Sequence, residues 1–163
     1  MVTVPEGVNL SIEGNKVTAK GPKGEVSKSV SPKVSVKMKD KDVVVEGKNH
    51  AFVKTTESVI SGMFRGVTEG FEKKLKVVYA HFPVTVEVKG NDILIKNFQG
   101  EKHPRKTVVV GGTKVEVKGQ NITISGPDRE AVGQTAANLK AVTRIKGKDG
   151  RVFQDGIYDA LEG

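Results

Sequence analysis

One segment of the chain occurs twice, and this internal duplication limits the possible folds more than any other feature. Residues 8–25 align with residues 84–101 at a constant shift. The aligned segments share six identical pairs: Val8/Val84, Gly14/Gly90, Asn15/Asn91, Lys20/Lys96, Gly24/Gly100 and Glu25/Glu101. Two copies are too few for a solenoid, so we predict a tandem duplication of one small domain, with boundaries at 1–81 and 82–163.

The alignment continues beyond this segment with a changed shift. Residues 43–47 match residues 122–126 only when three extra residues are placed in the second copy, around Glu101–Arg105. Loops tolerate insertions better than the elements they connect, and they often carry function. The second copy therefore differs from the first at a loop.

Both copies show the alternation of apolar and polar residues that is typical of half-buried strands. In the first copy the alternation covers residues 8–12, 16–20, 34–38 and 42–46. Glu13-Gly14-Asn15 and Lys89-Gly90-Asn91 supply residues that tolerate a positive φ, which predicts a hairpin in each copy.

A helix is predicted after the strands of each copy, because apolar residues recur there at spacings of three and four. In the first copy they are Phe52, Val59, Ile60, Met63, Phe64 and Val67; in the second they are Val132, Ala136, Leu139 and Val142. Gly126-Pro127-Asp128 is a typical helix start. We therefore predict an α+β fold in which each copy packs one antiparallel sheet on one helix, with the link near Ala80–Pro83.

The balance of charge favours a polyanionic partner. Lys and Arg number 27 against 19 Asp and Glu, which gives a net charge of +8. Residues 102–151 alone hold eleven Lys or Arg and four Asp or Glu. A basic excess attracts polyanions such as nucleic acid, although many proteins with other functions are moderately basic.

Several classes of protein find no support in the composition. The chain has no cysteine, hence no disulfide and no thiolate nucleophile. No apolar run approaches the roughly 20 residues that span a bilayer, and the N-terminus lacks an export signal, so we expect a cytoplasmic protein without a membrane partner. His50, His81 and His103 are scattered. We predict no catalytic residue, no metal site and no cofactor.

Three blocks of sequence resemble the ribosomal protein L6 family, in the form found in archaea and the eukaryotic cytosol. The first block is Gly62-Met63-Phe64-Arg65-Gly66-Val67-Thr68-Glu69-Gly70-Phe71 followed by Val78-Tyr79-Ala80-His81-Phe82-Pro83. The second is Asn97-Phe98-Gln99-Gly100-Glu101-Lys102. The third runs from Arg151 through Phe153 to Asp155-Gly156-Ile157-Tyr158.

This resemblance implies a function as well as a fold. It implies two similar α+β domains and a structural role in the large ribosomal subunit, with binding to large-subunit ribosomal RNA mainly through the second domain. It also implies a position near the stalk base and the sarcin–ricin loop. The expected partners are ribosomal RNA, neighbouring ribosomal proteins and nearby translation factors, whose relation need not be direct.

Two basic loops of the second copy are the predicted RNA contacts, because structured RNA is read largely through phosphates, 2′-hydroxyls and shape. The alternative for both is a solvated surface loop. Arg129 is a further candidate, although a salt bridge with Glu130 or another neighbour would explain it equally well. The predicted contacts are Gly100, Lys102, Arg105 and Lys106 in the first loop, Arg144, Lys146, Lys148 and Arg151 in the second, and Arg129.

Three aromatic residues lie close to these loops. Phe153 and Tyr158 could stack on bases. The alternation around Phe153 favours a core position for that residue instead. For Phe98 the pattern leaves both roles open.

Two other functions compete with RNA binding. A tandem-domain adaptor for protein interactions would explain the duplication but would leave the charge of residues 102–151 unused. An RNA-modifying enzyme would need a convergent acid/base, nucleophile or metal cluster, and the sequence contains none that we recognise.

Overall fold

The computed structural model describes residues 1–80 and 82–160 and divides them into two compact units. The first unit comprises Met1–Phe71 with Pro127–Arg129. The second comprises the other described residues from Glu72 onward. Each unit contains antiparallel strand pairs and one long helix, which confirms the predicted α+β class.

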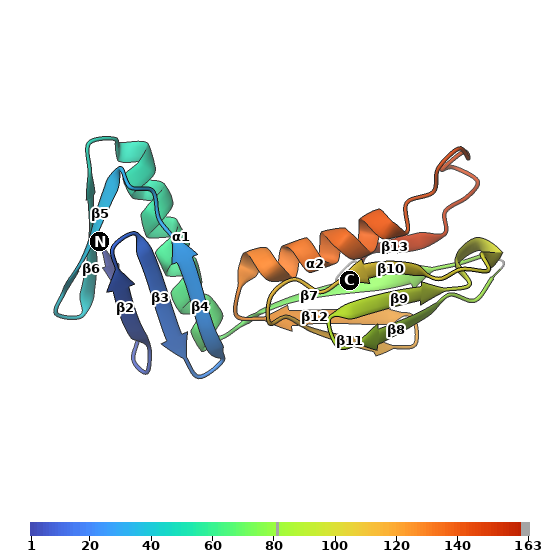
Figure 1. The fold of residues 1–163 in the computed structure, drawn as a ribbon, viewed down its shortest axis with the longest axis horizontal. Helices are drawn as coiled ribbons and strands as arrows, with labels where there is room; N and C mark the ends of the chain where they lie inside the picture. The colour runs from blue at the N-terminus through green and yellow to red at the C-terminus, as the bar shows by residue number, and fades with distance from the viewer. Residues whose placement is uncertain (81, 161–163) are drawn as a thin grey trace. The chain divides into compact units, whose positions relative to one another are not determined.

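Six strands and helix α1 form the first unit (Figure 1). One three-stranded sheet has the order β1-β6-β5, and the other has the order β2-β3-β4, with all pairs antiparallel. The elements are β1 (Val2–Thr3), β2 (Asn9–Glu13), β3 (Lys16–Gly21), β4 (Gly24–Ser29), β5 (Val34–Lys39), β6 (Asp42–Gly47) and α1 (His50–Thr68).

Helix α1 packs against β3, β4 and β6 through the apolar face that its sequence predicted. Ile60, Met63, Phe64 and Val67 are buried together with the inward-facing valines of the strands, such as Val17 and Val43. The helix begins after Asn49, whose side chain accepts a hydrogen bond from the Ala51 N–H. Phe52, which the spacing had placed on this face, is 37% exposed and is not part of the buried cluster.

The second unit contains seven strands, a short 3-10 turn and helix α2. One sheet has the order β10-β9-β8 and the other has the order β11-β12-β7-β13. The elements are β7 (Phe71–Val78), β8 (Thr85–Lys89), β9 (Asp92–Lys96), η1 (Phe98–Gly100), β10 (Arg105–Val108), β11 (Lys114–Lys118), β12 (Asn121–Gly126), α2 (Arg129–Val142) and β13 (Gly156–Asp159).

The core of the second unit lies between α2 and its sheets (Figure 1). Val132, Ala136 and Leu139 are buried on α2, as the three- and four-residue spacing predicted. Strand residues such as Ile93 and Ile122 are fully buried. The Thr135 hydroxyl also accepts a hydrogen bond from the Val110 N–H, which ties α2 to the segment between β10 and β11.

The duplication is visible in the order of the strands. The sheet β8-β9-β10 repeats β2-β3-β4, and β11-β12-β7 repeats β5-β6-β1. Strand β13 is an addition at the outer side of β7. The second unit is thus a copy of the first with one further edge strand. The sheet β1-β6-β5 of the first unit has no strand that corresponds to β13.

The compact units divide at a different place from the boundary expected from the repeat, because β7 belongs to the second unit. The sequence predicted a boundary at 81 and 82, whereas the compact units divide at Phe71 and Glu72. The reason is that β7 pairs with β12 and β13 in the second unit. The boundary of the duplicated sequence stays a prediction, and its link at 80–83 includes residue 81, which lies outside the described residues.

The two predicted hairpins are confirmed, and the loop that follows them distinguishes the two units. Gly14 and Gly90 have φ values of 57° and 59° in the β2–β3 and β8–β9 turns. Between β3 and β4 the chain turns over residues 22–23, whereas between β9 and β10 it runs over residues 97–104. The three extra residues of the second copy fall at this longer connection, which also takes in residues that align with the start of β4.

Candidate nucleic-acid interface

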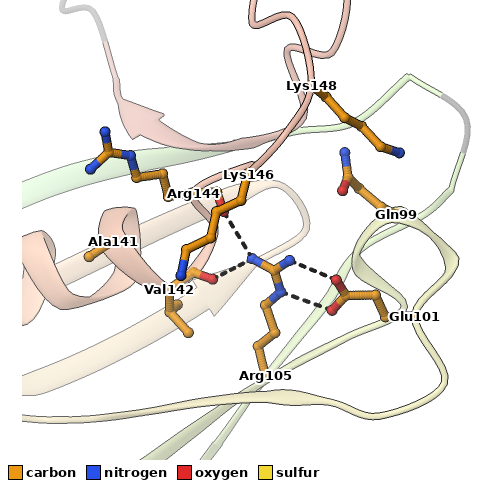
Figure 2. A pocket seen from close by; sticks show the side chains of 8 residues that line it. All are labelled: Gln99, Glu101, Arg105, Ala141, Val142, Arg144, Lys146 and Lys148. Atoms are coloured by element: carbon orange, nitrogen blue, oxygen red, sulfur yellow. Dashed lines mark hydrogen bonds and ion pairs between the residues drawn. The ribbon is translucent and has the colours of Figure 1, made fainter.

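The two predicted basic loops meet at one open pocket of the second unit, with a volume of about 550 Å³. One side is formed by the loop between β9 and β10, and the other by the end of α2 and the residues after it (Figure 2). The lining residues are Gln99, Glu101, Arg105, Ala141, Val142, Arg144, Lys146 and Lys148. Four of the eight carry a positive charge.

The backbone of the β9–β10 loop has an unusual conformation that gives this side of the pocket its shape. Asn97 and Gln99 have φ values of 59° and 52°, and Gly100 has a φ of 73°. Left-handed conformations cost non-glycine residues free energy, so the surrounding contacts must hold them. The Asn97 amide donates to the Pro83 carbonyl at 3.0 Å, and Phe98 is 1% exposed. Phe98 is therefore a core residue, which settles the alternative left open by the sequence.

Arg105 joins the two sides of the pocket. Its guanidinium donates to both carboxylate oxygens of Glu101, from Nε to Oε2 at 2.8 Å and from Nη2 to Oε1 at 2.6 Å. From Nη1 it donates to the carbonyl of Val142 at 2.8 Å and to that of Arg144 at 3.3 Å. Its plane also lies over the Phe98 ring at 4.5 Å from the centroid. These bonds use four of the five N–H groups that an arginine has.

The bidentate pair changes the protonation equilibria of both partners. The hydrogen bond from Arg105 is the main reason why the pKa of the Glu101 carboxyl lies below its ordinary value. The same bond raises the pKa of the Arg105 guanidinium. Both groups are therefore charged at neutral pH, and the pair is a charge-assisted one.

The opposite side of the pocket carries three cations, Arg144, Lys146 and Lys148. In Figure 2 the Arg144 side chain extends away from Arg105, while Lys148 lies on the side of Gln99. Lys148 is also placed 4.6 Å from the centroid of the Phe153 ring. All three residues are exposed, so a phosphate could reach their charge from solvent.

Phe153 is not a core residue, and the prediction of a buried position was wrong. Its side chain is 39% exposed. Residues 149–153 form a tight turn in which the N–H groups of Val152 and Phe153 both donate to the Asp149 carbonyl. A strand would alternate inward and outward, but this turn leaves Phe153 at the surface beside Lys148. Tyr158 is 47% exposed, and its hydroxyl donates to the Gln154 carbonyl.

The predicted contacts outside the pocket have different surroundings. Arg151 makes a bidentate pair with Asp149 at 3.0 and 3.1 Å and has a highly exposed side chain. Lys106 lies on the opposite face of β10 from Arg105, because side chains alternate along a strand, and it pairs with Asp92 at 3.2 Å. Arg129 is the first residue of α2, is grouped with the first compact unit and does not line the pocket. Gly100 and Lys102 belong to the pocket loop without lining the pocket.

Four lining residues were absent from the predicted set, namely Gln99, Glu101, Ala141 and Val142. Glu101 did carry a signal, since it is one of the six identical pairs of the internal repeat. An acidic residue is nevertheless a poor candidate for contact with a polyanion. Its role became visible only with the structure, which pairs it with Arg105.

Metal sites and membrane spans have no support among the described residues. Within residues 1–80 and 82–160, no three His, Asp or Glu side chains gather in a way that could hold a metal ion. Among the same residues, no helix has both the length and the apolar character needed to cross a membrane.

The fold and the pocket together define a class: a duplicated α+β protein with a cationic pocket in its second unit. A family model described as Ribosomal protein L6 matches residues 4–70 and 82–156. The chain is 50% identical to the Large ribosomal subunit protein uL6 of Methanobrevibacter smithii, over 96% of this chain and 92% of that protein. The chain therefore belongs to the ribosomal protein L6 family, which confirms the resemblance seen in its motifs.

Further relatives support the same assignment. Proteins with the same name from Natronomonas pharaonis and Archaeoglobus fulgidus are 47% and 48% identical to the chain. The alignments cover 96% and 97% of the chain, and 92% and 86% of the two relatives. These relatives are archaeal, in line with the form that the motifs indicated.

Proposed function

We propose that this chain is a structural constituent of the large ribosomal subunit in the cytoplasm and binds large-subunit ribosomal RNA through the cationic pocket of its second unit. The proposal rests on near-complete alignment with relatives named large ribosomal subunit proteins. The convergence of Arg144, Lys146 and Lys148 at one pocket is the structural observation that supports an RNA partner. Phosphates attract such exposed cations, and a fixed pocket can also select RNA shape.

Co-sedimentation tests the assignment to the subunit. A tagged full-length chain should travel with large subunits through a low-salt gradient and should be released as the salt concentration rises, because phosphate contacts weaken with salt. A protein-interaction adaptor would instead remain near the top of the gradient or follow another complex. Sedimentation with small subunits alone would also contradict the proposal.

A finer proposal concerns location, namely that the chain binds near the stalk base and the sarcin–ricin loop, beside neighbouring ribosomal proteins and the site of translation factors. The family resemblance supports this location. Contacts from two loops of one unit could fix the angle between RNA helices, because each phosphate contact is lost when the helices move apart. This role needs no chemistry by the protein itself.

Subunits assembled without the chain test this location. Their RNA should become more reactive to chemical probes near the sarcin–ricin loop, and factor-stimulated GTP hydrolysis should fall. Peptide-bond formation with small substrates needs no factor and should change much less. Loss of peptide-bond formation with normal factor-stimulated hydrolysis would contradict the proposed location.

A further inference from the structure

We infer that Arg105 is a positioning residue, paired with Glu101, that holds the cationic pocket in its binding shape without itself neutralising an RNA phosphate. This inference rests on the proposed function and assigns different roles to the residues of that site. Arg144, Lys146 and Lys148 are the phosphate-binding cations, and the Glu101–Arg105 pair fixes the segments that flank them.

The first argument is that most of the donors of Arg105 are already used. Four of its N–H groups bond to Glu101 and to the carbonyls of Val142 and Arg144. One guanidinium face also lies over the buried Phe98 ring. A phosphate that bound Arg105 bidentately would have to displace either Glu101, which is held by two short charge-assisted bonds, or the backbone carbonyls bonded to Nη1.

The second argument is that Arg105 bonds to backbone on the far side of the pocket. The Val142 and Arg144 carbonyls belong to the end of α2 and to the segment that leaves it, where helix carbonyls lack partners within the helix. Arg105 supplies donors to these groups. It thereby fixes the direction in which the chain departs toward Lys146 and Lys148.

The third argument concerns the loop on the near side. Between β9 and β10 the chain passes through left-handed conformations at Asn97 and Gln99, which must be held by contacts, and at Gly100. Glu101 follows directly in the chain. Its salt bridge with Arg105 attaches this loop to the first residue of β10. A pocket already in its binding shape has a higher apparent affinity than one that adopts the shape only part of the time.

A charge-neutralising substitution separates this role from simple electrostatics. Glu101→Gln removes one negative charge near the phosphate-binding cations, so electrostatics alone would strengthen RNA binding. If the pair positions the pocket, the same substitution should weaken binding of the full-length chain to transcribed large-subunit ribosomal RNA, by about fivefold to tenfold. Equal or tighter binding by Glu101→Gln would overturn the inference.

Glu87→Gln is the matched control. Glu87 lies on β8 of the same unit, forms a salt bridge with Lys96 and has a side-chain exposure of 37%, against 38% for Glu101. The substitution makes the same change in net charge away from the pocket. It should leave RNA affinity unchanged or slightly tighter, and a loss equal to that of Glu101→Gln would overturn the inference.

Arg105→Lys supplies the second arm, because lysine keeps the charge but has three donors instead of the planar fork. It should weaken binding about as much as Glu101→Gln, and the double variant should be little worse than either single one, since both break one pair. Fully additive losses, or normal binding by Arg105→Lys, would contradict a positioning pair.

Amide hydrogen exchange in the free protein distinguishes failure of this inference from failure of the proposed function. Glu101→Gln and Arg105→Lys should speed exchange in both 97–104 and 142–148 without RNA present, whereas Glu87→Gln should not. If the wild-type chain failed to bind the RNA while this exchange pattern held, the proposed function would fail and the positioning pair would stand. Unchanged exchange in both segments would overturn the pair itself.

Discussion

The backbone N–H of Ile157 donates a hydrogen bond of 3.1 Å to the hydroxyl of Thr143, which is 2% exposed. The same hydroxyl lies 3.2 Å from the Leu139 carbonyl, to which it donates in the last turn of α2. Thr143 therefore links the end of α2 to the added strand β13. This link holds the two ends of the intervening basic segment, at Thr143 and Ile157, next to each other.

Thr143→Val should destabilise the second unit. Valine preserves the shape but leaves the buried Ile157 N–H without its acceptor, which costs about 1 to 3 kcal/mol. Chemical denaturation of the full chain would measure the loss as a lower unfolding free energy of the second unit. Thr85→Val, at an exposed strand position, should change stability by less than about 0.5 kcal/mol. Equal effects of the two variants would show that the Thr143 hydroxyl does not hold β13.

Lys146→Ala combined with Lys148→Ala should make RNA binding less dependent on salt. If both ammonium groups neutralise phosphates, the slope of log affinity against log salt should become shallower by about one to two units. Lys114→Ala with Lys118→Ala removes the same charge from β11, outside the pocket. A titration series should show a much smaller change of slope for this control, and the reverse order would place the contact surface on β11.

The stabilising effect of the Glu101–Arg105 pair should depend on pH. Because the pKa of Glu101 is lowered in the folded protein, its contribution is fully present above the unfolded-state pKa and is lost as the pH falls through the folded one. The difference in unfolding free energy between the wild type and Glu101→Gln should therefore be largest near neutral pH and should shrink in acid. A difference that stays constant into the acidic range would mean that the carboxylate charge does not stabilise the fold.

Gly100→Ala should destabilise the pocket loop. Gly100 has a φ of 73°, and an added Cβ would come 3.3 Å from the Phe82 ring, so a cost of about 1 to 2 kcal/mol is expected. Gly112→Ala is a suitable control, because a Cβ added there would have no atom within 4 Å and the φ of Gly112 is not positive. Thermal unfolding of both variants checks this, and a neutral Gly100→Ala would show that the loop relaxes freely.

Sequence patterns predicted those parts of the fold that depend on neighbouring residues. The hairpins at Gly14 and Gly90 and the apolar faces of both helices follow from local periodicity and turn chemistry. The place of β7 does not, because it depends on pairing with strands far along the chain. The turn at residues 149–153 likewise broke the alternation from which a buried Phe153 was inferred.

The candidate site was predictable as two basic loops but not as one pocket. Charge patterning located Arg105 and Arg144, yet the hydrogen bond from Arg105 to the Val142 carbonyl joins residues 37 positions apart. A bond between residues so far apart in the chain cannot be predicted from the spacing of residues within one segment. Lys106 was grouped with Arg105 by sequence proximity, and the alternation of β10 places the two on opposite faces.

Mapping of crosslinks from the full-length chain to ribosomal RNA in intact ribosomes tests the central proposal most directly. Photoreactive groups would be introduced at Lys146 and Lys148 in the pocket and, for comparison, at Lys114 on β11. The proposal predicts that the two pocket positions crosslink to large-subunit RNA near the sarcin–ricin loop, with much weaker crosslinking from Lys114. Crosslinks from the pocket to small-subunit RNA, or to proteins alone, would contradict it.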